Sequence, residues 1–228
     1  MLHGFLPTLI EGTGITLAVA FLSLAIAILL GLIGAAARLS ASPILRGVAT
    51  VYTTVIRGVP DLVLMLLIFY GGQLAVNAIA MQIGVEEPID IDPFVAGVAT
   101  IGFIFGAYLT ETFRGALMAI HPGQREAGLA FGMSPVKVFM RITFPQMMRF
   151  AIPGFTNNWL VLVKSTALVS VIGLTDMMHR AGMAAGATRE PFTFYVAAAA
   201  IYLAITTVSL VILRALEKRV NVGIRRVA

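Results

Sequence analysis

The sequence contains no cysteine, and charged residues make up only 12% of its 228 residues. The absence of cysteine excludes disulfides and thiolate metal sites. Soluble domains carry about 25% charged residues, whereas 59% of this chain is hydrophobic. A soluble domain of this length has no room to bury so much apolar surface. The composition therefore indicates that a lipid bilayer surrounds much of the chain.

Groups that bind metals, phosphates or nucleic acids are also scarce. The three histidines, His3, His121 and His179, are far apart and none lies in an apolar run, which disfavours a metal site or a histidine-based active site. The sequence has no G-x-x-x-x-G-K-[ST] phosphate loop. The net charge is +5, but the basic residues lie between apolar runs and are not interleaved with aromatic residues, so we expect no nucleic-acid partner.

Long uncharged stretches predict an all-α integral membrane protein with about five transmembrane helices. Asp, Glu, Lys and Arg are absent from residues 12–37, 62–85, 93–110 and 191–213, and residues 150–175 contain only Lys164. Only helices or closed barrels satisfy the backbone inside lipid, and runs of this length are not the short alternating segments of a barrel. The expected helices run roughly over 12–37, 55–82, 93–117, 148–173 and 191–214, in a single domain of residues 1–228.

The charges between the apolar runs differ in sign from one connection to the next. Segments 38–57, 114–149 and 214–226 are rich in Lys and Arg, segment 86–92 holds only acidic charges, and segment 176–190 is mixed. Basic connections stay on the cytoplasmic side of a membrane. The pattern therefore predicts that the N-terminus lies outside and that the C-terminus lies in the cytoplasm.

The basic segment from Arg114 to Arg149 is long for a connection between membrane helices, which indicates a structure of its own. Residues 124–132 have helix-forming composition, with Glu126 in the first turn and Gly132 at the end. Ser134 and the proline after it favour the start of another helix. We expect a short helix lying across the cytoplasmic surface. A surface helical hairpin without a partner is the simpler alternative.

This segment resembles the EAA motif of ABC importer permeases. The residues that carry the resemblance are Glu126, Ala127, Gly128 and Gly132, followed by I-T-F-P at 142–145. The spacing fits throughout, although glycine replaces the usual third alanine at 128 and phenylalanine replaces the usual leucine at 144. In that family the short helix is the coupling helix, which docks in a groove of the ATPase subunit. The resemblance implies this role for the four residues at 126, 127, 128 and 132.

Three further stretches resemble the polar amino-acid uptake branch of the same family. They are TTVIRGVPDLVLMLLIFYG at 53–71, AYLTETFRGAL at 107–117 and FPQMMRFAIPGFTNNWLVLVKSTALVSVIG at 144–173. The likeness covers nearly the whole chain and is greatest to histidine/lysine-arginine-ornithine and opine permease subunits. It implies a non-catalytic, multi-pass permease subunit of the bacterial cytoplasmic (inner) membrane, which imports polar amino acids by alternating access. Basic amino acids are the favoured cargo, and an opine or another polar amino acid is the alternative.

The resemblance also implies partners, because the chain lacks a nucleotide-binding motif of its own. They are an ATPase subunit dimer that holds ATP and Mg, a second related permease subunit that completes a heterodimer, a periplasmic substrate-binding protein, and membrane lipid. The chain itself is expected to bind no cofactor and no metal. Two other function classes fit less well. An intramembrane enzyme lacks a catalytic constellation in the spans, and a stand-alone carrier or channel has no use for the structured 114–149 segment.

Ionisable residues at membrane depth cost about 2.5–3.5 kcal/mol each on insertion scales, so each needs a reason to be there. Arg57 and Asp61 are spaced i,i+4, and Glu111 and Arg114 are spaced i,i+3. Both spacings predict structural ion pairs on one helix face. In the alternative, Asp61 belongs to a gate or partner contact, and Glu111 contacts a cationic substrate.

Lys164 lies near the middle of the fourth expected helix, with no acidic neighbour on that helix. Asn157 is seven residues earlier and on the same face; Asn158 and Thr166 lie nearby. This face is expected either to line the substrate path or subunit seam, or to form a hydrogen-bond network between packed helices. Our hypothesis is that Lys164 discourages a second cationic substrate. A separate G-x-x-x-G pair, Gly102 and Gly106, permits close helix packing.

Overall fold

The computed structural model describes residues 4–85 and 87–220, and in these ranges every regular element is a helix. Five helical segments are long and apolar enough to cross a membrane, which confirms the predicted class and number of spans. They are Leu6–Arg38, Asp61–Gln82, Pro93–Met118, Pro135–Ile172 and Pro191–Val220. The residues at 86, 225 and 226, which contributed to the charge pattern, lie outside the described ranges.

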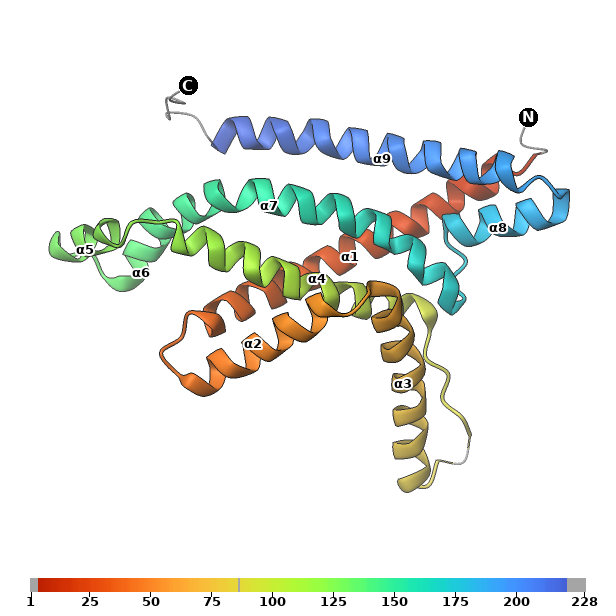
Figure 1. The fold of residues 1–228 in the computed structure, drawn as a ribbon, viewed down its shortest axis with the longest axis horizontal. Coiled ribbons are helices and arrows are strands. Elements are labelled where there is room, and N and C mark those ends of the chain that lie inside the picture. Colours follow the sequence, from red (N-terminus) through yellow and green to blue (C-terminus); the bar gives the residue numbers. More distant parts are fainter. Residues whose placement is uncertain (1–3, 86, 221–228) are drawn as a thin grey trace.

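The elements follow one another along the chain as shown in Figure 1. They are α1 (Leu6–Arg38), α2 (Pro43–Gly58), α3 (Asp61–Gln82), α4 (Pro93–Met118), α5 (Pro122–Ala130), α6 (Pro135–Val138), the π-helical turn η1 (Phe139–Thr143), α7 (Phe144–Ser165), the 3-10 helix η2 (Thr166–Ile172), α8 (Met177–Thr188) and α9 (Pro191–Val220). Helices α1, α4, α7 and α9 run along the long axis of the molecule.

Helices α1 and α4 form the centre of the bundle, and small residues let them approach closely. A Cβ atom on Gly102 would lie 2.7 Å from Ile26, and one on Gly106 would lie 2.8 Å from Leu30 Cβ. The Ser23 hydroxyl of α1 also donates a hydrogen bond to the Val98 carbonyl of α4 (3.1 Å). The G-x-x-x-G pair therefore serves helix packing, as the sequence suggested.

The second predicted span, 55–82, is wrong at its start because the helix is interrupted. Helix α2 already begins at Pro43, much of the expected 38–57 loop is helical, and α2 ends at Gly58. Val59 is extended, as favoured for a residue before proline. The chain changes direction at Pro60, and α3 follows. Figure 1 shows α3 running across the direction of the other long helices.

The fourth predicted span, 148–173, starts too late, since helical structure is continuous from Pro135. Pro145 lies in the first turn of α7. Proline lacks an N–H and clashes with the carbonyl four residues earlier, which would interrupt a regular α-helix. The wider π-helical turn η1, immediately before α7, accommodates this position without ending the helix. At the other end, η2 tightens the last turns before Gly173, whose φ is +96°.

The outer bounds of the first and last spans also extend beyond the expected ones. Helix α1 begins six residues earlier than expected. Glu11 therefore lies inside the helix, where its carboxylate pairs with Arg180 at 2.8 Å. Helix α9 continues to Val220, so its charged last turns extend the helix past the apolar run. The third span, predicted as 93–117, agrees with α4.

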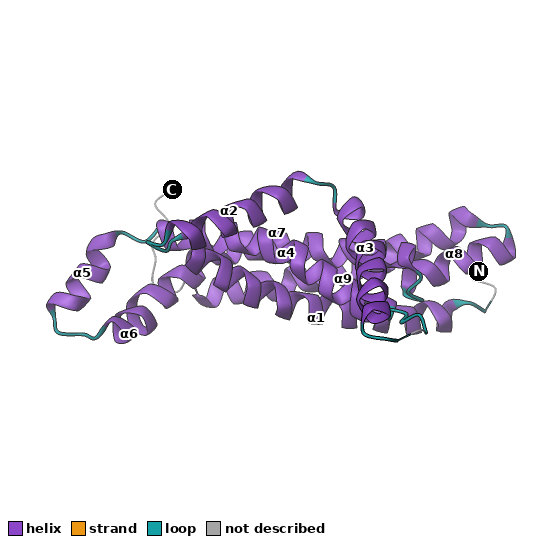
Figure 2. Ribbon diagram, turned by 90° about the horizontal axis from the view of Figure 1, so that it is seen from below, coloured by secondary structure: helices purple, strands orange, loops and turns teal. Residues whose placement is uncertain are grey.

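Helix α8 lies in the segment that was expected to be a loop, and it packs on the start of α1. The Asp176 side chain caps α8 by accepting a hydrogen bond from His179 N (2.9 Å). The Met177 N–H donates to the Thr16 hydroxyl (3.2 Å), and a Cβ atom on Gly12 would lie 2.8 Å from Met177 Cα. Figure 2 shows α8 at one end of the molecule and α5 with α6 at the other.

Candidate functional site

The segment between α4 and α7 forms a helical hairpin of α5 and α6 at one end of the molecule (Figures 1 and 2). The His121 ring Nδ1 caps α5 by accepting from Gly123 N (3.2 Å), and Ser134 caps α6 by accepting from Lys137 N (3.4 Å). Gly128 is the buried residue of α5. A Cβ atom there would lie 2.8 Å from Ile142 Cδ1 and 3.0 Å from Val138 Cγ2. Glycine at 128 therefore allows α5 to pack against the start of the fourth span.

Gly132 ends α5 in a left-handed conformation, with φ at +77°. Its N–H donates to the Leu129 carbonyl (2.9 Å), and the N–H of Met133 donates to the Gly128 carbonyl (3.1 Å). These two bonds form a Schellman motif, which needs a residue that adopts positive φ at little cost. The glycine thus sets the angle between α5 and α6, and with it the shape of the hairpin surface.

The outer surface of the hairpin combines charged and apolar side chains. Glu126 and Ala127 are exposed on α5. Phe131 is 89% exposed, and Leu129 and Val136 are exposed beside it in sequence. Sequence reasoning did not single out Phe131, although a phenylalanine between two short helices outside the spans was a usable signal. Exposed apolar groups within a polar surrounding mark protein interaction surfaces.

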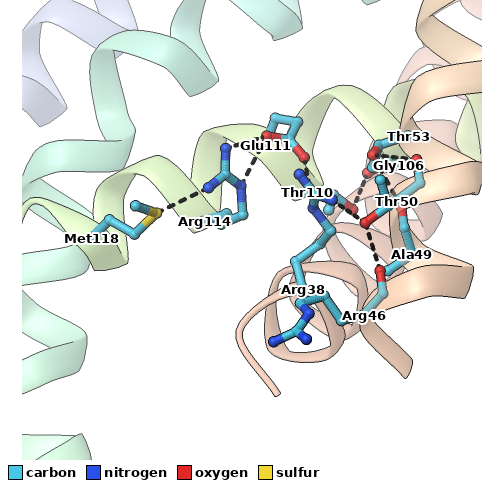
Figure 3. Close-up of polar contacts among 10 residues, drawn as sticks. All are labelled: Arg38, Arg46, Ala49, Thr50, Thr53, Gly106, Thr110, Glu111, Arg114 and Met118. Atoms are coloured by element: carbon cyan, nitrogen blue, oxygen red, sulfur yellow. Dashed lines mark hydrogen bonds and ion pairs between the residues drawn. The ribbon is translucent and has the colours of Figure 1, made fainter. Parts of the chain in front are cut away.

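Glu111 of α4 is the centre of a three-residue charge cluster (Figure 3). The expected pair with Arg114 is present, at 2.7 Å between Arg114 Nη2 and Glu111 Oε2. Arg38, at the end of α1, is a second partner, with its Nε 3.3 Å from Glu111 Oε1. The Arg38 Nη1 also donates to the Thr50 hydroxyl of α2. Glu111 therefore joins α4 to α1, and Arg38 extends the contact to α2, a role that spacing along α4 alone did not reveal.

The expected Arg57–Asp61 ion pair is wrong for the described structure. The i,i+4 geometry requires one continuous helix, and the break between α2 and α3 removes it. The Arg57 guanidinium instead lies over the Tyr108 ring, 5.5 Å from its centroid. Asp61 lies near Ser165, at the end of α7. Asp61 thus lies where the start of α3 approaches the fourth span.

The polar residues of α7 and η2 point in different directions. Asn158 donates from Nδ2 to the Thr112 hydroxyl of α4 (2.8 Å). Thr166 is buried and lies 3.4 Å from the Tyr202 hydroxyl of α9. Asn157 and Lys164 are both exposed. The polar residues at this end of the fourth span thus include two that bridge helices and two that stay accessible.

Lys164 lines an open depression of about 490 Å³ between the end of α7 and the helices α8 and α9. The polar groups around it are Tyr195, Tyr202 and Thr206 of α9. In residues 4–85 and 87–220, no ion pair or hydrogen bond joins Lys164 to Asp61 or Glu111. The predicted path residues therefore lie in several separate contacts and do not form one compact site. The same ranges hold no group of three or more metal-ligating side chains.

A family comparison agrees with this architecture. Residues 27–222 match the family described as binding-protein-dependent transport system inner membrane component. The match includes the α5–α6 hairpin and four of the five candidate spans in full.

Several permease proteins are similar to this chain over almost its whole length. The histidine/lysine/arginine/ornithine transport system permease proteins HisQ of Salmonella typhimurium and Escherichia coli are 51% and 52% identical, over 99% of both chains in each pair. The octopine transport system permease protein OccQ of Rhizobium radiobacter is 41% identical, over 96% of this chain and 92% of its own length.

Solved structures show the same fold. A crystal structure of an amino acid ABC transporter with histidines contains a chain that is 34% identical, with a TM-score of 0.79 over 93% of this chain and 94% of that chain. A chain of the MetNI methionine ABC transporter is 14% identical and has a TM-score of 0.69, which shows the fold alone. With five spans, the hairpin and these relatives, the chain belongs to the family of inner membrane components of binding-protein-dependent transport systems, and is a multi-pass permease subunit of an ABC importer for amino acids.

Proposed function

We propose that this subunit imports basic amino acids, namely histidine, lysine, arginine and ornithine, into the cytoplasm. The observation that carries this substrate class is identity of 51–52% over 99% of the chain with permeases named for these four amino acids. Opines are the second candidate, because octopine and nopaline permeases are 41–42% identical over at least 96% of the chain.

The proposed energy source is a separate ATPase subunit dimer, with ATP and Mg held there and no catalytic step on this chain. Its docking surface is the outer face of the α5–α6 hairpin. Glu126 and Ala127 are exposed on that face, and the apolar Phe131 next to Gly132 supplies buried contact area on docking. Gly128 supports the surface from behind, because its lack of a side chain lets α5 pack on the fourth span.

The importer also requires a second, related permease subunit and a periplasmic binding protein. Helix α3 supports the need for a second subunit, because it is long and apolar enough to cross a membrane, yet only 11% of its most apolar stretch is buried within this chain. The binding protein would meet the end that carries α8, opposite the hairpin (Figure 1). In this orientation the N-terminus lies outside and the C-terminus in the cytoplasm, as the basic connections favour.

The proposed substrate path uses accessible or bridging polar groups of α3, α4 and the fourth span. Lys164 and Asn157 present accessible polar atoms, and Asp61 lies near Ser165, between α3 and the end of α7. Asn158 and Thr166 hold the fourth span against α4 and α9. Glu111 has two arginine partners, so its role is structural in this proposal.

Uptake of labelled amino acids tests the cargo. Cells that lack their own basic amino-acid importers would express this chain with its associated subunits, and labelled arginine and histidine would be offered with unlabelled octopine as competitor. Uptake of both amino acids with little competition supports the basic amino-acid importer. Strong inhibition by octopine, with weak uptake of arginine, would favour an opine importer.

A pull-down tests the ATPase contact. We expect Gly132→Val to lose the ATPase subunit, since a β-branched residue at φ +77° is strained and distorts the hairpin. Gly14→Val is the matched control, because Gly14 lies in α1 at the opposite end and an added Cβ atom there would have no neighbour within 4 Å. Retention of the ATPase by Gly132→Val, at the level of the control, would count against docking on the hairpin.

A further inference from the structure

We propose that a pocket formed by Arg38, Arg46 and Arg114 binds the phosphate of an anionic phospholipid. The pocket has a volume of about 530 Å³ and opens where α1 and α4 end and α2 begins. Its other lining residues are Pro43, Gly47, Thr50 and Val51. A volume of this size is within the range of roughly 300–1,000 Å³ typical of small-molecule sites. We call it the arginine pocket.

The arginine pocket lies at a membrane boundary. Arg38 is the last residue of the first candidate span, and Arg114 is in the last turns of the third. Basic pockets between transmembrane helices at this level suit phospholipid headgroups. The position of the pocket at the span ends is independent of the cargo of the transporter.

The charge in the arginine pocket is only partly balanced. Glu111 is the one acidic partner that ion pairs with Arg38 and Arg114 among the described residues, and the side chains of these arginines are 19% and 28% exposed. Arg46 forms no ion pair in the described part of the chain, and it is exposed. The pocket thus contains three guanidinium groups, two of which share one carboxylate, and this leaves an excess of positive charge for an anion.

The guanidinium groups of Arg38 and Arg114 are held in place by contacts that leave donors available. Arg38 donates to the Thr50 hydroxyl, and Thr50 in turn donates to the Arg46 carbonyl (2.6 Å) (Figure 3). Arg114 donates from Nε to Glu111 Oε2 (2.9 Å). A guanidinium has five N–H donors in a planar fork, which matches the oxygen geometry of a phosphate. The pocket therefore presents partly pre-oriented phosphate donors.

An exposed apolar row distinguishes a lipid from a free anion as the ligand. Val51 lines the pocket and is 63% exposed, and Val55 lies one turn further along the same face of α2. Helix α2 runs from the pocket towards the middle of the molecule, where α3 begins (Figure 1). An acyl chain can follow this row while the phosphate stays between the arginines. A free phosphate gains nothing from the valines.

Native mass spectrometry of the purified full chain tests the proposal. The probes are dioctanoyl-phosphatidylglycerol, dioctanoyl-phosphatidylcholine and inorganic phosphate. We expect tighter binding of the phosphatidylglycerol than of the phosphatidylcholine. The variant Arg46→Gln should weaken phosphatidylglycerol binding roughly fivefold, the loss expected for one basic residue near an anionic headgroup. Arg46 is chosen because its removal breaks no ion pair of the described fold.

Arg214→Gln is the matched control, since Arg214 is an exposed arginine near the end of α9 that does not line the pocket. A second variant, Val51→Ser, should weaken phosphatidylglycerol binding and leave any phosphate binding unchanged. Equal binding of the two lipids, or equal effects of Arg46→Gln and Arg214→Gln, would overturn the proposal. Displacement of the lipid by inorganic phosphate at similar concentration would assign the pocket to a free anion and would also overturn it.

Discussion

At the scale of single residues, Glu111 shows how a charge is tolerated at the edge of a membrane span. Its carboxylate has arginine partners on two helices, Arg114 on α4 and Arg38 at the end of α1. The carboxylate is only 16% exposed, so an unpaired charge there would carry a large desolvation cost. Two partners offset that cost and at the same time fix where α1 ends relative to α4.

Glu111→Gln should therefore destabilise the fold by about 1–2 kcal/mol, because two poorly hydrated arginines lose their counter-charge. The measurement is denaturant unfolding in mixed micelles, followed by the fluorescence of Trp159, the single tryptophan, which is buried against Phe21. Glu87→Gln is the control, since Glu87 is an exposed loop residue. Equal unfolding midpoints for the two variants would contradict a structural role for Glu111.

The contribution of Asp176 to folding stability changes with pH in the opposite direction to that of a salt-bridged carboxylate. Burial raises the pKa of the Asp176 carboxyl above its usual range, although hydrogen bonds from backbone N–H groups of His179 and Met178 oppose the shift. The folded state therefore keeps the proton to higher pH than the unfolded state. This contribution to stability is complete below the unfolded pKa, about 3.9, and is lost as pH rises through the raised folded pKa.

The variant Asp176→Asn should match or exceed the wild-type stability at pH 7 and lack this pH dependence, because asparagine is neutral and still caps α8. Asp176→Ala should be less stable than Asp176→Asn by about 1 kcal/mol at every pH, since the cap to His179 N is gone. Melting temperatures between pH 4 and about 7 separate the two effects. A lower stability of Asp176→Asn at neutral pH would show that the charged carboxylate is favourable.

At the scale of elements, the contact between α1 and α4 depends on the absence of side chains. A Cβ atom on Gly106 would lie 2.7 Å from the Tyr52 hydroxyl and 2.8 Å from Leu30 Cβ. The Tyr52 hydroxyl also donates to the Phe103 carbonyl (2.5 Å), so α2 is held to the same region of α4. One glycine thus permits three helices to meet.

Gly106→Ala should cost about 1–3 kcal/mol through overpacking. Gly115→Ala, in the same helix, has nothing within 4 Å of its added Cβ and should be neutral or slightly stabilising, because alanine is the better helix former. Thermal melting of the two variants in one detergent makes the comparison. Similar melting temperatures would mean that α1 moves aside at little cost.

The elements also show which features the sequence could predict. Spans were predictable because uncharged runs of about 20 residues have one solution in lipid. The break between α2 and α3 was visible only as Pro60, and a proline near a helix start is compatible with a bend or an interruption. Helix α8 was missed because it is short and lacks an apolar run, although Asp176 was a usable capping signal.

The site was predicted less completely, since spacing informs only about partners on the same helix. The Glu111–Arg114 pair follows from i,i+3 spacing, but Arg38 and Glu111 are joined by the packing of α1 on α4. The contacts of Asn158 with Thr112 and of Thr166 with Tyr202 likewise depend on tertiary packing. The role of Gly128 in the hairpin became clear only from its distance to Ile142.

At the scale of the whole molecule, the two ends have different chemical character. One end carries the α5–α6 hairpin with the exposed Phe131, the ends of α1 and α4, and the arginine pocket. The opposite end carries α8, capped by Asp176 and packed on the start of α1. An importer needs such a division, because the energy source and the substrate delivery act from opposite sides of the membrane.

The absence of cysteine makes the proposed orientation directly testable, since any thiol signal must come from an introduced residue. Met183→Cys places one on the exposed face of α8, and Gln124→Cys places one on the exposed face of α5. We expect a membrane-impermeant maleimide, added to intact spheroplasts, to label Met183→Cys only. Gln124→Cys should react only after the membrane is permeabilised, because the basic hairpin stays on the cytoplasmic side.

The reverse labelling pattern would place the hairpin outside and remove it from reach of a cytoplasmic ATPase. Labelling of both positions in intact spheroplasts would mean mixed insertion, in which the basic connections fail to set the orientation. Labelling of Met183→Cys alone leaves α5, with Phe131 beside it, on the side where ATP is available. The charge asymmetry of the connections would then account for both the orientation of the helices and the location of the coupling surface.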